Sequence, residues 1–257
     1  MLLETRNLGM NFGGLLALEG LNLKVPPGAL YGLIGPNGAG KTTVFNLLSG
    51  FLKPTQGDIF FNGSDITGLP PERITRLGIS RTFQNIRLFE DLSVLDNVLV
   101  GCHCRRQASL WQAALHFPGY LQEEKTHLAR CRGLLGEAGL TAAQDEKAGQ
   151  LPYGHQRRLE ITRALATEPR LLLLDEPAAG LNPQETRELM DFLRAIHQEH
   201  HLTILIIEHN LRLVMGLCQQ ITVLDHGLTL AAGSPVEVRN NPAVIKAYLG
   251  KGSETVI

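Results

Sequence analysis

A glycine-rich loop between an apolar run and a helix-forming run constrains this chain more than any other feature. The loop runs from Gly35 to Thr42, and its sequence GPNGAGKT fits the pattern GxxxxGK[ST] in full. The apolar run at residues 30–34 has the length of a buried parallel strand, and residues 41–48 predict a helix. In such a loop, successive backbone N–H groups face phosphate oxygens at the positive end of the helix. The sequence therefore predicts a phosphate-binding strand–loop–helix unit of an α/β fold.

The residues of this loop form the predicted nucleotide-binding set. Lys41 supplies a positive charge to the β- and γ-phosphates of a nucleotide, and the Thr42 hydroxyl is a ligand for Mg²⁺. Thr43 reaches a further phosphate oxygen. A chance glycine-rich turn is the alternative, and the strand and helix on either side argue against it. The complete set is Gly35, Pro36, Asn37, Gly38, Ala39, Gly40, Lys41, Thr42 and Thr43.

A second apolar run, at residues 171–174, ends in the adjacent carboxylates Asp175 and Glu176. Open α/β sheets bind ligands at the carboxyl ends of their strands, so we expect both acids to lie near the loop. Asp175 suits the coordination shell of Mg²⁺. Glu176 suits a residue that orients or deprotonates the attacking water beside the γ-phosphate. Two solvated acids at a strand end are the alternative, which the phosphate loop weakens.

The remaining pattern divides the chain into an α/β core and an inserted helical segment. From about residue 92 to residue 148, apolar residues recur at helical spacing without strand alternation, which predicts a helical subdomain. Strands and helices alternate after it, as in parallel βαβ units. The expected strands are 21–25, 30–34, 56–63 (entering a turn), 171–174, 203–207, 221–224 and 228–231; the expected helices are 41–48, 183–197 and 242–249.

Composition excludes several classes of protein. The 257 residues can hold one large α/β domain or two smaller ones, and the net charge of -1 provides no basic surface for nucleic acid. Glu4 and Arg6 interrupt the N-terminal apolar residues that a signal peptide would need, and no apolar run approaches the ~20 residues of a membrane span. We expect a soluble chain made in the cytoplasm, with any membrane spans supplied by other subunits.

The cysteines indicate neither a disulfide framework nor a metal site. Cys102, His103 and Cys104 lie in a predicted helix, where residues two apart point to nearly opposite faces. A shared metal ion is therefore hard to build there, and ordinary thiols are the favoured interpretation.

Residues 151–177, LPYGHQRRLEITRALATEPRLLLLDEP, join an amphipathic helix to the acidic strand. This segment resembles the signature helix and Walker B strand of ABC-type ATPases, and the order of motifs matches that family along essentially the whole chain. The resemblance implies an α/β P-loop NTPase (RecA-like) core with an antiparallel β subdomain and an inserted α-helical subdomain, the ABC ATPase architecture. It implies one domain over residues 1–257, with the core at 1–91 and 156–257 and the helical subdomain at about 92–155.

The resemblance also implies roles for residues outside the phosphate loop. Phe12 occupies the place of the aromatic residue that stacks on adenine, although on sequence alone it could equally be a core residue. Gln84 resembles the glutamine that contacts Mg²⁺ and the water. His209 resembles the switch histidine that hydrogen-bonds the γ-phosphate; a capped histidine at a strand end is its alternative. Asn182 stands where the family usually has Asp.

The segment that aligns with the LSGGQ-type signature departs from it. Pro152 replaces Ser, Tyr153 replaces the first Gly, and His155 replaces Gln. In the family, this segment touches the ATP of the opposite subunit. Because Pro152 offers neither a hydroxyl nor an N–H, we expect the contact to come from Tyr153, Gly154 and the helix dipole.

Within the family, several segments look like the G-type ATP-binding subunit of bacterial branched-chain amino-acid importers. They are LPYGHQRRLEITRAL, LLLLDEPAAGLNP, IIEHNLRLVMGLC and AAGSPVEVRNNPAVIKAYLG. Related urea or amide importers, lipopolysaccharide-transport ATPases, soluble ABC ATPases of DNA repair or translation, and an inactive structural subunit are the alternatives. The resemblance implies ATP and Mg²⁺ as cofactors and a peripheral place on the cytoplasmic face of the bacterial inner membrane. It implies as partners a second, different ATPase subunit in a head-to-tail dimer, two polytopic permease subunits and, indirectly, an extracytoplasmic binding protein.

The departure at Pro152 gives a testable prediction. Pro152→Ser should retain or modestly raise ATPase activity, because it adds at most one hydrogen bond, ~1 kcal/mol. Steady-state ATP turnover of the two proteins measures this. A collapse of turnover in the variant would mean that Pro152 does not occupy the signature position.

Overall fold

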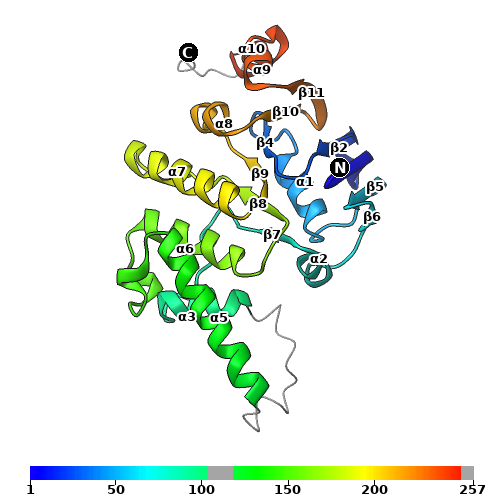
Figure 1. Cartoon of the computed structure of the whole chain (residues 1–257). Helices are drawn as coiled ribbons and strands as arrows, with labels where there is room; N and C mark the ends of the chain where they lie inside the picture. The colour runs from blue at the N-terminus through cyan, green and yellow to red at the C-terminus, as the bar shows by residue number, and fades with distance from the viewer. Residues whose placement is uncertain (103–117, 250–257) are drawn as a thin grey trace.

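The computed structural model describes residues 1–102 and 118–249, and within them the strands form two sheets (Figure 1). The antiparallel sheet has the order β2-β1-β5-β6 with β3 beside β1; its strands are β1 (Leu3–Phe12), β2 (Leu15–Leu21), β3 (Lys24–Val25), β5 (Gln56–Phe61) and β6 (Ser64–Asp65). The second sheet has the order β11-β10-β4-β9-β8-β7. Its strands are β4 (Leu30–Ile34), β7 (Ile79–Arg81), β8 (Leu171–Asp175), β9 (Thr203–Ile207), β10 (Gln220–Asp225) and β11 (Leu228–Gly233). All pairings in the second sheet are parallel except that of β10 with β11.

The helices separate into those that cover the sheets and those that form a group of their own. Helices α3, α5 and α6 pack against one another in the lower part of Figure 1, away from the antiparallel sheet. Among the described residues, the helices are α1 (Lys41–Leu48), α2 (Pro71–Leu77), α3 (Val94–Cys102), α5 (Pro118–Glu137), α6 (Tyr153–Leu165), α7 (Pro183–Glu199), α8 (Leu211–Leu217), α9 (Pro235–Arg239) and α10 (Pro242–Leu249), with short 3₁₀ turns η2 (Thr141–Ala143) and η3 (Ala148–Gln150).

The parallel sheet is buried on both faces, which explains its unbroken apolar strands. Along β8, Leu171 and Leu173 belong to the core that holds α1 and the antiparallel sheet. Leu172 and Leu174 belong to the other core, with residues of α3, α5, α6, α7 and α8. Because successive side chains of a strand point to opposite faces, such a strand needs an apolar residue at every position.

Most predicted elements agree with the structure, and one is wrong. The strands at 30–34 and 203–207 and the helices at 41–48 and 242–249 have the predicted bounds. Residues 21–25 do not form one strand, because side chains take over the backbone hydrogen bonds there. Asn22 Oδ1 accepts from the amide of Asn7, and the amide of Leu23 donates to Thr5 Oγ1 over 2.8 Å. The alternation is real, but β2 ends at Leu21 and β3 begins at Lys24.

The predicted helical region, at about residues 92–155, contains α3 and α5. Helix α6 begins inside this region at Tyr153 and extends past its predicted end at residue 155. Cys102, at the end of α3, lies with its sulfur 3.1 Å from that of Cys131 on α5, and both thiols are free and buried. His103 and Cys104 lie outside the described residues. In the part of the chain that is described, no group of three or more His, Cys, Asp or Glu residues could hold a metal ion. Over the same residues, no helix combines the length and apolar character needed to cross a membrane.

The hydroxyl of Thr5 gives a prediction about stability. It donates to the carbonyl of Leu21 over 2.9 Å and accepts from the amide of Leu23, and Thr5 is buried. Thr5→Val leaves that amide and carbonyl unsatisfied in the core, so the free energy of unfolding should fall by about 1–3 kcal/mol. Thr229→Val, at an exposed position of β11, is the control and should change it by less than about 0.5 kcal/mol. Equal changes in denaturant unfolding would contradict this role of Thr5.

Candidate active site

The phosphate loop needs glycine because the backbone of other segments lies against it. A Cβ atom added to Gly35 would lie 2.2 Å from the carbonyl oxygen of Leu224, at the end of β10. At Gly40, with a φ of 99°, the same atom would lie 2.7 Å from the carbonyl oxygen of Ala17. Both contacts are with backbone atoms, which cannot move aside as a side chain could. The loop is therefore held between β2 and the β10–β11 pair.

The start of α1 presents donors toward the loop. Gly40 caps the helix with no side-chain hydrogen bond, so side chains do not occupy the first amides. Lys41 is buried, and its ammonium donates to the carbonyls of Gly35 and Pro36 over 2.7 and 2.9 Å. Thr42 is exposed beside it. An uncapped helix N-terminus with an adjacent ammonium is an arrangement that binds phosphate.

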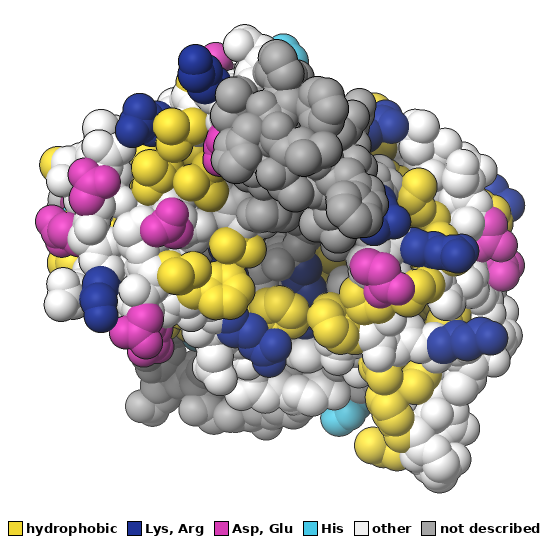
Figure 2. Space-filling model, turned by 90° about the horizontal axis from the view of Figure 1, so that it is seen from below, with side chains coloured by type: hydrophobic (Ala, Val, Ile, Leu, Met, Phe, Trp, Pro, Cys, Tyr) yellow, Lys and Arg dark blue, Asp and Glu magenta, His cyan; other side chains and the backbone are white. Residues whose placement is uncertain are grey.

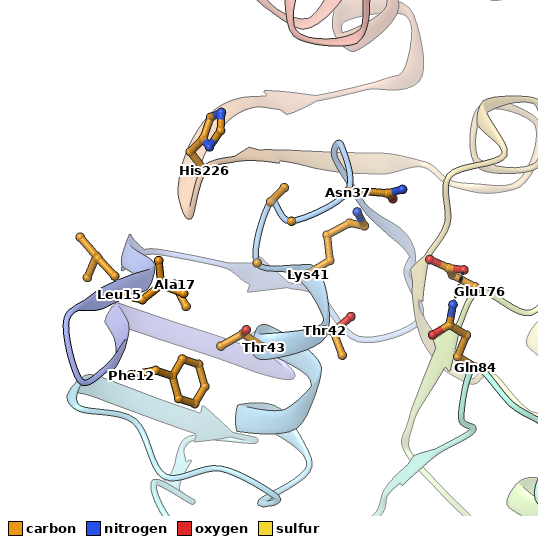
Figure 3. A pocket seen from close by; sticks show the side chains of 14 residues that line it. Phe12, Leu15, Ala17, Asn37, Lys41, Thr42, Thr43, Gln84, Glu176 and His226 are labelled. Carbon is orange, nitrogen blue, oxygen red and sulfur yellow. Dashed lines mark hydrogen bonds between the residues drawn. The ribbon is translucent and has the colours of Figure 1, made fainter. Parts of the chain in front are cut away.

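A cavity of about 640 Å³ extends from this loop in two directions. Figure 3 shows Phe12 at one end and Gln84 beside Glu176 at the other, with Lys41 and Thr42 between them. The structure thus brings together residues that the sequence predicted from four separate segments. The lining residues are Phe12, Leu15, Leu16, Ala17, Asn37, Gly38, Ala39, Gly40, Lys41, Thr42, Thr43, Gln84, Glu176 and His226.

Three polar side chains meet at the acidic end of the cavity. The amide nitrogen of Gln84 donates to Glu176 Oε2 over 3.1 Å, and His209 Nδ1 lies 3.6 Å from the same oxygen. Glu176 has a φ of 46°, in the left-handed region that favours glycine, and its amide donates to the carbonyl of Ile207. Strained backbone of this kind costs about 1–3 kcal/mol and is concentrated at functional sites. The carboxylate of Glu176 is therefore held in a fixed place between an amide and an imidazole.

Asp175 lies behind the cavity rather than on its wall. Its side chain is only 6% exposed, and Oδ2 accepts from the guanidinium of Arg81 over 2.8 Å. The predicted metal ligands, Thr42, Gln84 and Asp175, offer hydroxyl, amide and carboxylate oxygens, the donor chemistry that Mg²⁺ prefers. Gln84 uses its nitrogen toward Glu176, which leaves its carbonyl oxygen for a cation. The donor set thus fits Mg²⁺.

The signature segment lies outside this cavity. Pro152 caps α6 with φ -54° and ψ 148°, and no side chain caps the helix start. Pro152 and Tyr153 are exposed, whereas Gly154 is buried. A Cβ atom at Gly154 would lie close against the side chain of Glu185. Tyr153 and Gly154 therefore do not join the other predicted nucleotide-binding residues within one chain.

Glu208 is a residue of this region that the sequence analysis does not single out. It is fully buried, and its two carboxylate oxygens accept from the amides of Ala178, His209 and Asn210. Burial raises the pKa of the Glu208 carboxyl above its ordinary value. Glu208 thereby ties the segment after Glu176 to the segment of His209. An acid directly after the apolar run, between Ile207 and His209, is the signal that could have identified it.

Besides Leu15, Leu16 and Ala17, the cavity wall holds one more residue that the sequence did not predict, His226. It lies in the turn between β10 and β11 with a φ of 47°, and its side chain is largely exposed. Figure 3 shows it above the loop, on the side opposite Glu176. Its sequence context, Asp-His-Gly between two strands, predicts only a hairpin turn.

Comparison with known families and structures agrees with this geometry. The family model described as "ABC transporter" matches residues 18–179, and the model described as "Branched-chain amino acid ATP-binding cassette transporter" matches residues 229–254. The chain is 47% identical over 250 residues to the high-affinity branched-chain amino acid transport ATP-binding protein LivG of Escherichia coli K12, covering 97% of this chain and 98% of that one. It shows the same identity and coverage with the corresponding protein BraF of Pseudomonas aeruginosa.

A solved structure has the same fold over nearly the whole chain. The ADP conformation of MJ1267, an ATP-binding cassette of an ABC transporter, superimposes with a TM-score of 0.85. The two chains are 32% identical, and the match covers 97% of this chain and 98% of the other.

The position of Glu176 gives a prediction about hydrolysis. Glu176→Gln keeps the shape of the side chain but removes the base, so ATP turnover should fall by about 100-fold or more while ATP binding persists. Steady-state turnover and nucleotide binding measure the two effects. Glu199→Gln, at an exposed acid near the end of α7, is the control and should turn over ATP as the wild type does. Unchanged turnover in Glu176→Gln would refute its role as base.

Proposed function

This chain belongs to the ABC transporter family, and from that premise we propose that it is the ATP-hydrolysing subunit of an importer for branched-chain, hydrophobic amino acids. The predicted fold class and ATPase activity are those of the family. The observation that carries the proposal is the single cavity in which the phosphate loop, Gln84 and Glu176 meet.

The identity of the transported substrate rests on the relatives. The match of residues 229–254 to the branched-chain amino acid model supports this substrate class over a related urea, amide or lipopolysaccharide system. So does the 47% identity to the transport proteins of two bacteria. The substrate itself does not enter the nucleotide cavity, so no residue of the active site selects it. A soluble ABC ATPase of another function is the second candidate, and these same relatives weigh against it.

We assign the steps of hydrolysis to residues in the cavity and directly beside it. Lys41 and the first amides of α1 bind the β- and γ-phosphates, and Glu176 orients and deprotonates the attacking water. His209 donates to the γ-phosphate, and Gln84 holds the carboxylate of Glu176 in place over 3.1 Å. Mg²⁺, when bound at Thr42, Gln84 and Asp175, would neutralise charge on the phosphate oxygens.

The opposite end of the cavity fits the base of the nucleotide. Phe12 is 45% exposed at the end of β1, although an aromatic side chain is ordinarily covered in a folded chain. Its ring lines one end of the cavity, as Figure 3 shows, and so offers an exposed ring face there. We propose that adenine stacks on this face, which would add apolar contact to the phosphate interactions.

A second ATPase subunit is proposed to complete the site. Tyr153 and Gly154 lie outside the cavity of their own chain, and no side chain caps the start of α6, where Pro152 and Tyr153 are exposed and Gly154 is buried. A helix N-terminus of this kind favours an anion, so a head-to-tail partner could present it to the γ-phosphate. In the cell, we expect the partner to be a different paralogue.

A groove on the lower face supports docking of the two permease subunits. It has a volume of about 610 Å³, and its wall combines exposed apolar residues such as Phe89 with the cations Arg87 and Arg163. Figure 2 shows this face with hydrophobic side chains around a hollow and Lys and Arg side chains among them. Apolar anchors with a polar rim are typical of protein interfaces.

The same groove is connected to the active site through α6. Arg157 is fully buried and donates to the carbonyls of Phe83 and Gln84 over 2.9 and 2.8 Å. Glu160 accepts from the amide of Arg87 over 3.2 Å. The segment after Gln84 thus moves with α6, whose first residues form the proposed surface for the partner's ATP. We propose that this connection transmits closure of the dimer to the permeases.

The proposed domain organisation and location of the protein go together with these assignments. Residues 1–91 and 156–257 would form the core and residues 92–155 the helical subdomain, with the subunit bound to the cytoplasmic face of the bacterial inner membrane through the permeases. An extracytoplasmic binding protein would deliver the amino acid to those permeases.

Uptake by whole cells tests the proposed substrate. Deletion of the gene should abolish uptake of radiolabelled leucine, isoleucine and valine at low concentration, and the wild-type gene should restore it. The gene for Glu176→Gln, which keeps the fold but lacks the base, should not restore it. Uptake of lysine is the internal control. If the deletion spares these amino acids and instead impairs urea or amide uptake, the substrate assignment is wrong.

A further inference from the structure

A buried guanidinium lies behind the active site and connects three segments of it. Arg81, the last residue of β7, donates through one nitrogen to Asp175 Oδ2 over 2.8 Å. Its other terminal nitrogen donates to Asn46 Oδ1 and Ser49 Oγ, over 2.7 and 2.9 Å, at the end of α1. The side chains of Arg81 and Asp175 are each 6% exposed. One side chain thus joins the helix after the phosphate loop to the acidic strand.

Aromatic rings enclose this guanidinium. Its central carbon lies 5.5 Å from the ring centre of Phe45, 5.9 Å from that of Phe51 and 5.2 Å from that of Phe83. Phe51 and Phe83 also pack edge to face. Cations over aromatic faces are attracted by the ring quadrupole, and the ion pair with Asp175 is almost fully covered, since each of its side chains is 6% exposed. The arrangement is specific for a planar cation, because Lys lacks the fork of donors that meets three acceptors at once.

The location of Arg81 relates it to the reaction. Arg81 pairs with Leu173 across β7 and β8, which places its side chain at the strand end where Asp175 lies. Three residues further on, Gln84 contacts Glu176. The carboxylate of Asp175 therefore has one oxygen fixed by Arg81, and its other oxygen remains for a cation.

We propose that Arg81 is a positioning residue that holds the Asp175 carboxylate in the orientation needed for Mg²⁺. This inference rests on the proposed role of Asp175 as a metal ligand. Arg81 does not touch the nucleotide in this arrangement. It acts through Asp175 and keeps α1, β8 and the segment of Gln84 in fixed relation. Groups that orient a metal ligand typically change metal affinity about 10- to 100-fold when they are removed.

Binding of a fluorescent ATP analogue, with and without Mg²⁺, tests this inference in the full-length chain. In EDTA, Arg81→Lys should bind the analogue within about twofold of the wild type, because the phosphate loop is untouched. When Mg²⁺ is titrated in, the concentration that gives half of the Mg²⁺-dependent gain in affinity should rise about tenfold or more. Thermal unfolding of each protein in EDTA is measured in parallel.

Two further variants make the result specific. Asn46→Ala removes one acceptor of the guanidinium and keeps the ion pair, so it should shift the Mg²⁺ requirement in the same direction by a smaller factor, and it does not leave a buried charge unpaired. Arg6→Gln is the matched control: Arg6 also lies over an aromatic ring, that of Phe60, at 4.4 Å, but it is exposed on β1 and its ion pair is with Glu4 instead of Asp175. Its Mg²⁺ requirement should equal that of the wild type.

The possible results are distinguishable. A raised Mg²⁺ requirement in Arg81→Lys and Asn46→Ala, with binding in EDTA retained, supports the positioning role. A lower unfolding temperature with an unchanged Mg²⁺ requirement would overturn it and leave Arg81 as a structural ion pair. If the wild type itself gains no affinity from Mg²⁺, the proposed metal role of Asp175 is wrong, and this inference is overturned together with it.

Discussion

The active site depends on the alignment of parallel strands at one edge of the sheet. Strands β4, β9, β8 and β7 lie side by side in register. The loop after β4, the acids at the end of β8, His209 after β9 and the segment of Gln84 after β7 therefore emerge at the same level. The chain must bury this sheet on both faces to keep the alignment, and it does so with two separate apolar cores. The packing of the whole sheet, and not any single interaction within the site, thus sets the relative positions of these segments.

The buried charged groups of this structure determine the distances between functional segments rather than adding to the stability of the fold. Arg157, Glu160 and Glu208 are almost fully buried, and removing a charge from water costs several kcal/mol per ion. Each recovers that cost through hydrogen bonds to backbone atoms of functional segments: the carbonyls of Phe83 and Gln84, or the amides around His209. An apolar replacement could pack equally well, but it could not determine where those backbone atoms lie. Such groups therefore explain why the segments around Glu176 keep one arrangement.

The sequence predicted the parts of the site that are local in the chain. The phosphate loop, Asp175 and Glu176 each follow an apolar strand, and that context is visible within about ten residues of sequence. The inserted helices followed from apolar residues at helical spacing, and the fold class followed from the family resemblance in the order of motifs. Contacts distant in sequence were not predictable: Arg81 and Asp175 are 94 residues apart, and Ala178 and Glu208 are 30 apart. The expected strand at 21–25 was wrong for a related reason, because its alternation is genuine but a distant side chain, Thr5, takes its hydrogen bonds.

The surface at the start of α6 offers different contacts from those of the cavity. The residues responsible are Pro152 and Tyr153. Pro152 has no N–H to donate, and Tyr153 lies against Gly180 in the segment after Glu176, so that a Cβ atom at Gly180 would come within 3.1 Å of the Tyr153 ring. The Tyr153 hydroxyl also reaches the guanidinium of Arg157 at 3.5 Å, the same group that holds the carbonyl of Gln84. An aromatic ring in place of a glycine thus connects the proposed partner-facing surface to the segment that lies beside the chain's own Glu176. If a partner subunit contacts this surface as proposed, the guanidinium of Arg157 would connect that contact to the backbone of Gln84.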